Sequence, residues 1–101
     1  MSQSGFTHSS FTRTANVIMD RPARYGKQLA SHIGHKVTVD SVDDGWVAHI
    51  AGGLGYITPH ATTLDLVAEG IDDASLERIK DVLERHLRKF AGELEITVDW
   101  R

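Results

Sequence analysis

Residues 37–50 read VTVDSVDDGWVAHI and predict a β-hairpin. Val37 and Val39 alternate with polar residues, at the two-residue period of a strand that is buried on one side. The run DDG at 43–45 is a strong turn signal, because Asp and Gly tolerate the backbone angles of tight hairpin turns. It leads into a second apolar run at 46–50. The centre of the chain is therefore predicted to form an antiparallel pair of strands.

The chain on both sides of this hairpin supplies further strands. Residues 62–69 (TTLDLVAE) alternate again and predict a neighbouring strand, and residues 11–19 predict a first strand. Residues 51–59 (AGGLGYITP) are expected to bend or bulge. The glycine run at 52–55 does not match a phosphate-binding loop, because neither a helix start nor a lysine follows it.

Two helices and a last strand complete the predicted fold. The first helix opens at 20–25 (DRPARY), where the missing N–H of Pro22 is harmless, and ends at Gly34. The second is capped at 72–73, ends at Gly92, and carries apolar residues at helical spacing: Leu76, Ile79, Val82, Leu83, Leu87 and Phe90. Residues 94–100 alternate cleanly and predict a final strand, with Leu94, Ile96, Val98 and Trp100 on its apolar side.

These elements define an α+β fold of order β-α-β-β-β-α-β. We expect an antiparallel or mixed sheet with both helices packed on one face, because a sheet with one apolar side must cover that side. The other face would stay open. We expect residues 1–10 to form a flexible tail and residues 11–101 to form a single domain.

Composition excludes several classes of protein. The chain has 101 residues and no cysteine, so disulfides and thiolate chemistry are excluded. It contains no long apolar run and no secretory signal, which predicts a cytoplasmic protein that does not enter a membrane. The net charge is −3, and residues 37–77 hold eight acids and no lysine or arginine. This balance argues against nucleic acid as a partner.

The chain carries six histidines, which titrate near neutral pH and are common metal ligands. His32 and His35 lie at the end of the first helix, and His86 lies on the apolar stripe of the second. If the helices pack side by side, these three could hold zinc, iron or haem iron. The alternative is structural: His86 donates an N–H to a backbone carbonyl, and His32 caps its helix.

A basic group near the first helix is a second candidate site. Arg24, Lys27 and Lys36 could attract an anionic ligand, although exposed helix charges are often only a solvated face. No catalytic residue is predicted, since Ser31 and Ser75 lack the ordered base that activates a hydroxyl.

Several of these motifs together resemble a bacterial family labelled domain of unknown function 2218. The matching residues are Arg24-Tyr25, Gln28-Leu29, His32-x-x-His35-Lys36, His86-Leu87-x-x-Phe90-Ala91 and the terminal Trp100, so the similarity runs from about Thr12 to Trp100. The resemblance implies the α+β fold and a gene setting near siderophore use and ferric-siderophore reduction. It supplies no catalytic residues, and this chain departs from the family at Ile33, where tryptophan is common.

Three functions remain open from the sequence. The first is a small cytosolic binding or accessory protein in iron or siderophore handling, which we expect to be non-enzymatic. Its partner would be an anionic iron chelate or a redox protein. The second is a metal or haem protein that uses His32, His35 and His86. The third is an interaction module that forms a homodimer through the open sheet face. No cofactor is required by the sequence.

Overall fold

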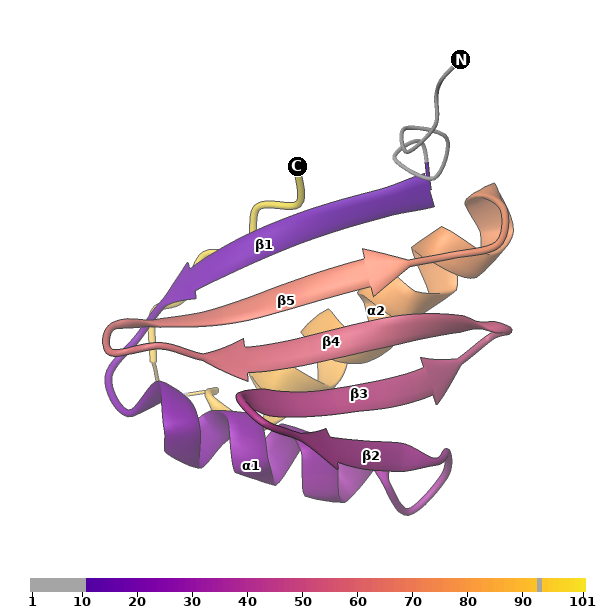
Figure 1. Ribbon diagram of the computed structural model, residues 1–101. Coiled ribbons are helices and arrows are strands. Elements are labelled where there is room, and N and C mark those ends of the chain that lie inside the picture. The colour runs from indigo at the N-terminus through magenta and orange to yellow at the C-terminus, as the bar shows by residue number, and fades with distance from the viewer. Residues whose placement is uncertain (1–10, 93) are drawn as a thin grey trace.

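The computed structural model of the protein describes residues 11–92 and 94–101, which form one sheet and two helices (Figure 1). In chain order the elements are β1 (Thr12–Ile18), α1 (Pro22–Ile33), β2 (Val39–Val42), β3 (Gly45–Ile50), β4 (Gly53–Pro59), β5 (Thr63–Glu69) and α2 (Asp73–Phe90). The expectation of a flexible tail over residues 1–10 lies outside the described residues. The α+β class is confirmed.

The sheet is antiparallel throughout, with strand order β1-β5-β4-β3-β2. Strands β2 to β5 form a meander, and α1 carries the chain across from β1 at one edge to β2 at the other. The predicted hairpin is confirmed: Val42 pairs with Gly45 across the two-residue Asp43-Asp44 turn. Because side chains alternate between the two sides of a strand, this register also sets which residues of the hairpin face the helices.

Residues 53–59, expected to bend or bulge, instead form a central strand. The turn before this strand needs only two residues, Ala51 and Gly52, whose φ angles of 51° and 81° are both positive, as in a type I′ hairpin. Gly55 faces α2, where a Cβ would lie 3.3–3.4 Å from Leu83, Ile50 and Ile79. This glycine therefore allows α2 to pack closely on the strand.

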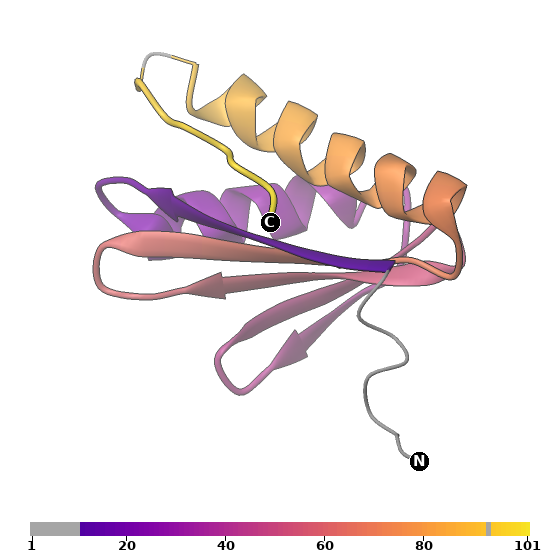
Figure 2. The same cartoon turned by 90° about the horizontal axis from the view of Figure 1, so that it is seen from above.

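Residues 94–100, predicted as a strand, lie outside the sheet. They return beside α2 and cover the sheet near β1 (Figure 2). Their alternation is still expressed as burial, since the apolar residues are half-buried and the polar ones exposed. Arg101 exchanges two backbone hydrogen bonds with Thr14, and Trp100 Nε1 donates to Glu84 on α2 (3.0 Å). The element order is therefore β-α-β-β-β-β-α: the sheet still has five strands, because β4, which was not predicted, takes the place of the predicted strand at 94–100.

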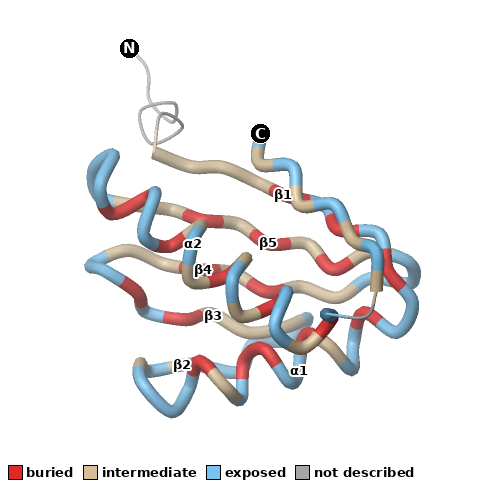
Figure 3. The backbone as a smooth tube through the Cα atoms, turned by 180° about the vertical axis from the view of Figure 1, so that it is seen from behind, coloured by how far each residue is buried: buried red, intermediate tan, exposed pale blue. Residues whose placement is uncertain are grey.

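Both helices cover the same face of the sheet, as predicted (Figure 2). The buried residues lie between the layers and include Val17, Leu29, Ile57, Leu66 and Leu83, each with no exposed surface (Figure 3). Neither helix in the part of the chain described here is long and apolar enough to cross a membrane. The two helices lie against each other as well as against the strands, and their seam forms the outer surface of this layer.

Candidate functional site

The start of α2 is fixed to the β3–β4 turn by two side chains. Asp72 caps the helix by accepting a hydrogen bond from the backbone N–H of Ser75 (2.8 Å). The Ser75 hydroxyl is buried, donates to the carbonyl oxygen of Ala51 (2.9 Å) and accepts from the N–H of Ile71 (3.2 Å). Ser75 is therefore structural, and it places the first turns of α2 above the end of β3.

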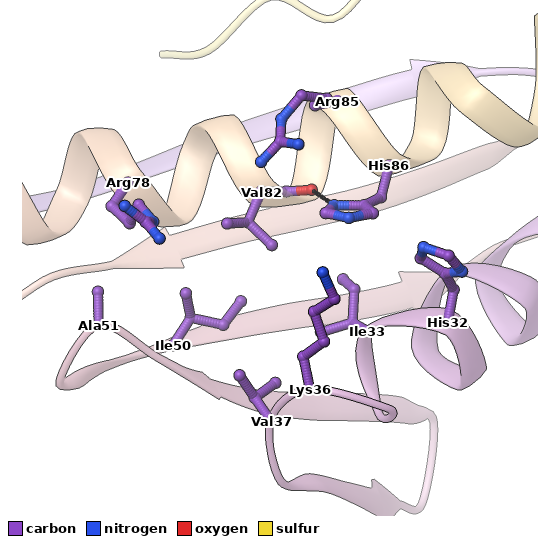
Figure 4. Close-up of a pocket in the computed structure, with 10 residues that line it drawn as sticks. All are labelled: His32, Ile33, Lys36, Val37, Ile50, Ala51, Arg78, Val82, Arg85 and His86. Atoms are coloured by element: carbon purple, nitrogen blue, oxygen red, sulfur yellow. Dashed lines mark hydrogen bonds between the residues drawn. The ribbon is translucent and has the colours of Figure 1, made fainter.

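A groove of about 370 Å³ lies between the end of α1 with the residues that follow it, the end of β3, and the side of α2 that faces them (Figure 4). Its apolar lining comes from all three elements and consists of Ile33, Val37, Ile50, Ala51 and Val82. Its polar lining consists of Lys36, Arg78, Arg85, His32 and His86. A concave apolar surface with a few polar groups is the usual form of a small-molecule site.

The groove is cationic, although the chain as a whole is acidic. No Asp or Glu is among the lining residues. Within residues 11–92 and 94–101, neither Lys36 nor Arg78 forms an ion pair, while Arg85 pairs with Asp81 along the helix (3.3 Å). Like charges gathered without acids repel one another, so an anion that enters the groove is favoured electrostatically.

Two histidines and a phenylalanine lie in a row where the helices meet. The His32 ring centroid lies 5.0 Å from that of His86 and 5.1 Å from that of Phe90. His86 Nδ1 lies 2.7 Å from the carbonyl oxygen of Val82, and because a carbonyl only accepts, this nitrogen carries the proton (Figure 4). The Nε2 atom of neutral His86 is then the one with a free lone pair.

The surroundings of His32 disfavour its charged form. Burial is the first cause that lowers the pKa of His32 from its ordinary value, followed by the positive charges of His86, Lys89, His35 and Lys36. His32 is thus more often neutral at pH 7 than a free histidine.

The three histidines predicted as metal ligands are only partly brought together. His32 contacts His86, while the His32 and His35 ring centroids are 6.3 Å apart. Among the residues that the structure describes, no three His, Cys, Asp or Glu side chains are grouped closely enough to hold a metal ion. The structural reading of His86, with an N–H donated to a backbone carbonyl, matches the observed bond.

The residues predicted to bind an anion divide between two hollows. Lys36 lines the groove, whereas Arg24 and Lys27 line a second hollow of about 420 Å³ along α1. Sequence reasoning missed Arg78 and Arg85 as groove residues. Their signal was their spacing: with Val82 they stand at i, i+4 and i+7, which is one face of a helix.

The protein is thus a two-layer α+β domain with a cationic groove between its helices. The chain belongs to the bacterial family described as "Uncharacterized protein conserved in bacteria (DUF2218)", whose model matches residues 14–101. This match confirms the resemblance seen in the sequence.

One solved structure supports the fold. It is the NMR structure of PA4090 from Pseudomonas aeruginosa, which is 23% identical in sequence, with a TM-score of 0.76 over 90% of this chain and 95% of that chain. No curated protein matches the chain. The site therefore has to be interpreted from its own chemistry.

Proposed function

We propose that this protein is a non-enzymatic binding or accessory protein that takes a small organic anion in the groove between α1 and α2. The observation that carries the proposal is the lining of that groove, which combines apolar side chains with Lys36, Arg78 and Arg85 and includes no Asp or Glu. Of these three cations only Arg85 has an ion-pair partner among the described residues, Asp81. In a chain with fourteen acids and eleven lysines and arginines, such a gathering is not what composition alone would give.

The size of the groove limits the ligand. Its volume of about 370 Å³ lies near the lower end of small-molecule sites, which run from about 300 to 1,000 Å³. A compact anion with an apolar or aromatic part would fill it, and so would one arm of a larger chelate. The apolar floor would contact the ring or chain, and the cations at the rim would contact the charged oxygens.

An anionic iron chelate is the ligand class that we favour. Catecholate and carboxylate chelates of ferric iron carry both features, a negative charge and flat apolar rings or short chains. The motif resemblance to a family found near siderophore genes points to the same class. That association is genomic rather than mechanistic, so the chemistry of the groove has to carry the test.

Calorimetric titration of the protein, prepared without a histidine tag, tests this proposal. The probes are ferric complexes of 2,3-dihydroxybenzoate and citrate, which are anionic, and ferrioxamine B, which carries the same metal but is cationic. We expect the anionic probes to bind, to weaken as salt is added, and to lose affinity about tenfold or more in Lys36→Gln/Arg78→Gln.

The matched control is Lys80→Gln/Arg88→Gln, which also replaces one lysine and one arginine, both of them on α2. Lys80 and Arg88 are paired with Glu77 and Glu84 and line neither hollow. The control should bind nearly as the parent protein does. Equal losses in both double variants, or binding of ferrioxamine B as tight as that of the anionic probes, would contradict the proposal.

Metal or haem ligation is a second candidate, favoured by the orientation of His86. A ligating histidine usually donates its other ring N–H to a carbonyl or carboxylate, and His86 does so to Val82. With His32 beside it, His86 would provide one of two ligands and leave other positions to a small molecule. Titration with zinc, ferrous iron and haem should then show binding that His86→Gln abolishes and that weakens below about pH 6. Absence of binding, or binding unchanged in His86→Gln, would exclude this role.

A further inference from the structure

The groove and the second hollow meet at one side chain. His32 lines both of them, and its ring lies between those of His86 and Phe90 at 5.0 and 5.1 Å. His86 belongs to the groove and Phe90 to the second hollow. The three rings therefore form a continuous aromatic row that runs from one hollow into the other along the seam between the helices.

The second hollow shares the charge character of the groove. It is lined by the exposed cations Arg24 and Lys27, and again no Asp or Glu is among its lining residues. Over the described parts of the chain, neither Arg24 nor Lys27 makes an ion pair. Two separate sets of cations without ion pairs among the described residues thus lie in two hollows that the His32 ring joins.

We propose that the two hollows are subsites of a single cleft for an elongated ligand with an anionic group at each end and a flat apolar or aromatic middle. This inference rests on the proposed function and adds to it the shape and valency of the ligand. One anionic end would contact Lys36 and Arg78, the middle would lie against His32 and Phe90, and the other end would contact Arg24 and Lys27.

The physical gain of such a site is bivalency. Once one end is bound, the other end is held near its own cations at a high effective concentration, so affinity rises without any change in the individual contacts. The gain depends on length: a ligand too short to span the row at His32 receives only one contact, and its affinity equals that of a monoanion.

Rigid aromatic acids test this requirement by calorimetry on the whole chain. The probes are benzoate with terephthalate, and biphenyl-4-carboxylate with biphenyl-4,4′-dicarboxylate, so that each pair differs by one carboxylate. We expect at least one dicarboxylate to bind about tenfold or more tighter than its monocarboxylate. The variant Arg24→Gln/Lys27→Gln should remove that gain, so that the dicarboxylate binds no tighter than its monocarboxylate does to the same variant.

The outcomes separate this inference from the proposal beneath it. If monocarboxylates bind in a manner that depends on Lys36 and Arg78, but the second carboxylate adds nothing, the single-cleft inference is overturned and the groove remains. A gain that survives Arg24→Gln/Lys27→Gln overturns it as well. If none of the acids binds and the ferric chelates do not bind either, the proposed function fails together with the inference.

Discussion

On the open side of the sheet, ionisable side chains lie in pairs. Along the seam between α1 and α2, by contrast, Arg85 is paired with Asp81, but four other cations of the described residues form no ion pair: Arg24, Lys27, Lys36 and Arg78. His49 contacts Asp40 at 2.9 Å, His60 contacts Asp65 at 2.9 Å, and Tyr56 donates to Glu69 at 3.1 Å. Burial and the neighbouring Glu69 raise the pKa of Tyr56, which keeps this donor protonated. The ionisable groups of the open side are thus paired with one another, although the Oδ1 atom of Asp65 is buried without a hydrogen-bond partner.

The helix side combines the buried core of the molecule with its least balanced group of charges. The buried layer lies between the helices and the sheet, and the groove and the second hollow, with their cations, lie along the same two helices. A tight core beneath a surface of unbalanced charge is what a binding site needs, because the scaffold holds repelling groups in place until a ligand neutralises them.

The largest expected effect is a loss of stability that differs between the two sides of the sheet because they are packed differently. Leu83 is fully buried between α2 and the sheet, so Leu83→Ala should lower the free energy of unfolding by about 2–5 kcal/mol. Val67 lies half-buried on the open side, and Val67→Ala should cost roughly 1 kcal/mol or less. Urea denaturation measures both. Similar losses at the two positions would mean that the open face is as tightly packed as the core.

The next effect tests the attachment of α2 to the β3–β4 turn. Ser75→Ala removes the hydroxyl that joins Ala51 and Ile71, and it should cost about 1–3 kcal/mol because two hydrogen bonds of about 0.5–1.5 kcal/mol each are lost. Ser31→Ala, at an exposed position of α1, should change stability by less than about 0.5 kcal/mol. A cost at Ser75 no larger than that at Ser31 would remove the anchoring role.

A smaller effect contrasts the charges themselves. Tyr56→Phe deletes the hydrogen bond to Glu69 and should destabilise the protein by about 0.5–1.5 kcal/mol. Lys36→Gln should instead leave stability unchanged or raise it by a few tenths of a kcal/mol at low ionic strength, since it relieves repulsion in the groove. Thermal melts at two salt concentrations measure this difference. A clear loss of stability in Lys36→Gln would show that Lys36 has a stabilising partner.

The smallest effect is a pH dependence. Because the folded protein lowers the pKa of His32, the unfolded chain binds this proton more readily, and the free energy of unfolding should fall as pH drops through the ordinary value of 6.5 and then through the lowered pKa. His32→Asn should remove this component, while His49→Gln should not. The measurement is urea denaturation between pH 5 and 8. A stability difference between parent and His32→Asn that is constant with pH would contradict the assignment.

The sequence predicted most of the fold because binary patterning is local. The turn at Asp43-Asp44, the two helices and the burial alternation of residues 94–100 all followed from spacing within short segments. Two features did not. Gly53 and Gly55 masked a central strand, because the groups for which they make room are distant in sequence. Gly53 makes room for the carbonyl oxygen of Glu69 and for Ile79, and Gly55 for Ile79 and Leu83. The last segment alternates as a strand does but is fixed by α2 and one pair of hydrogen bonds to Thr14.

The site was predicted only in part for the same reason. His32, His86 and Lys36 were identified by residue type, but their grouping depends on how the helices pack. Arg78 and Arg85 carry an ordinary helical spacing, and only the structure places them opposite Lys36. Likewise, only the structure shows that Arg24 and Lys27 lie in a different hollow from Lys36, and that the row of rings at His32 lies where the two hollows meet.

The most direct test of the central claim is an NMR titration of the ¹⁵N-labelled protein with the gallium complex of 2,3-dihydroxybenzoate, a diamagnetic substitute for the ferric chelate. We predict saturable shifts in the backbone amides of Ile33, Lys36, Ala51 and Val82, which line the groove, and shifts that disappear in Lys36→Gln/Arg78→Gln. Shifts that map instead to Val47, Tyr56 and Val67 on the open face, or no shifts at millimolar ligand, would contradict the account.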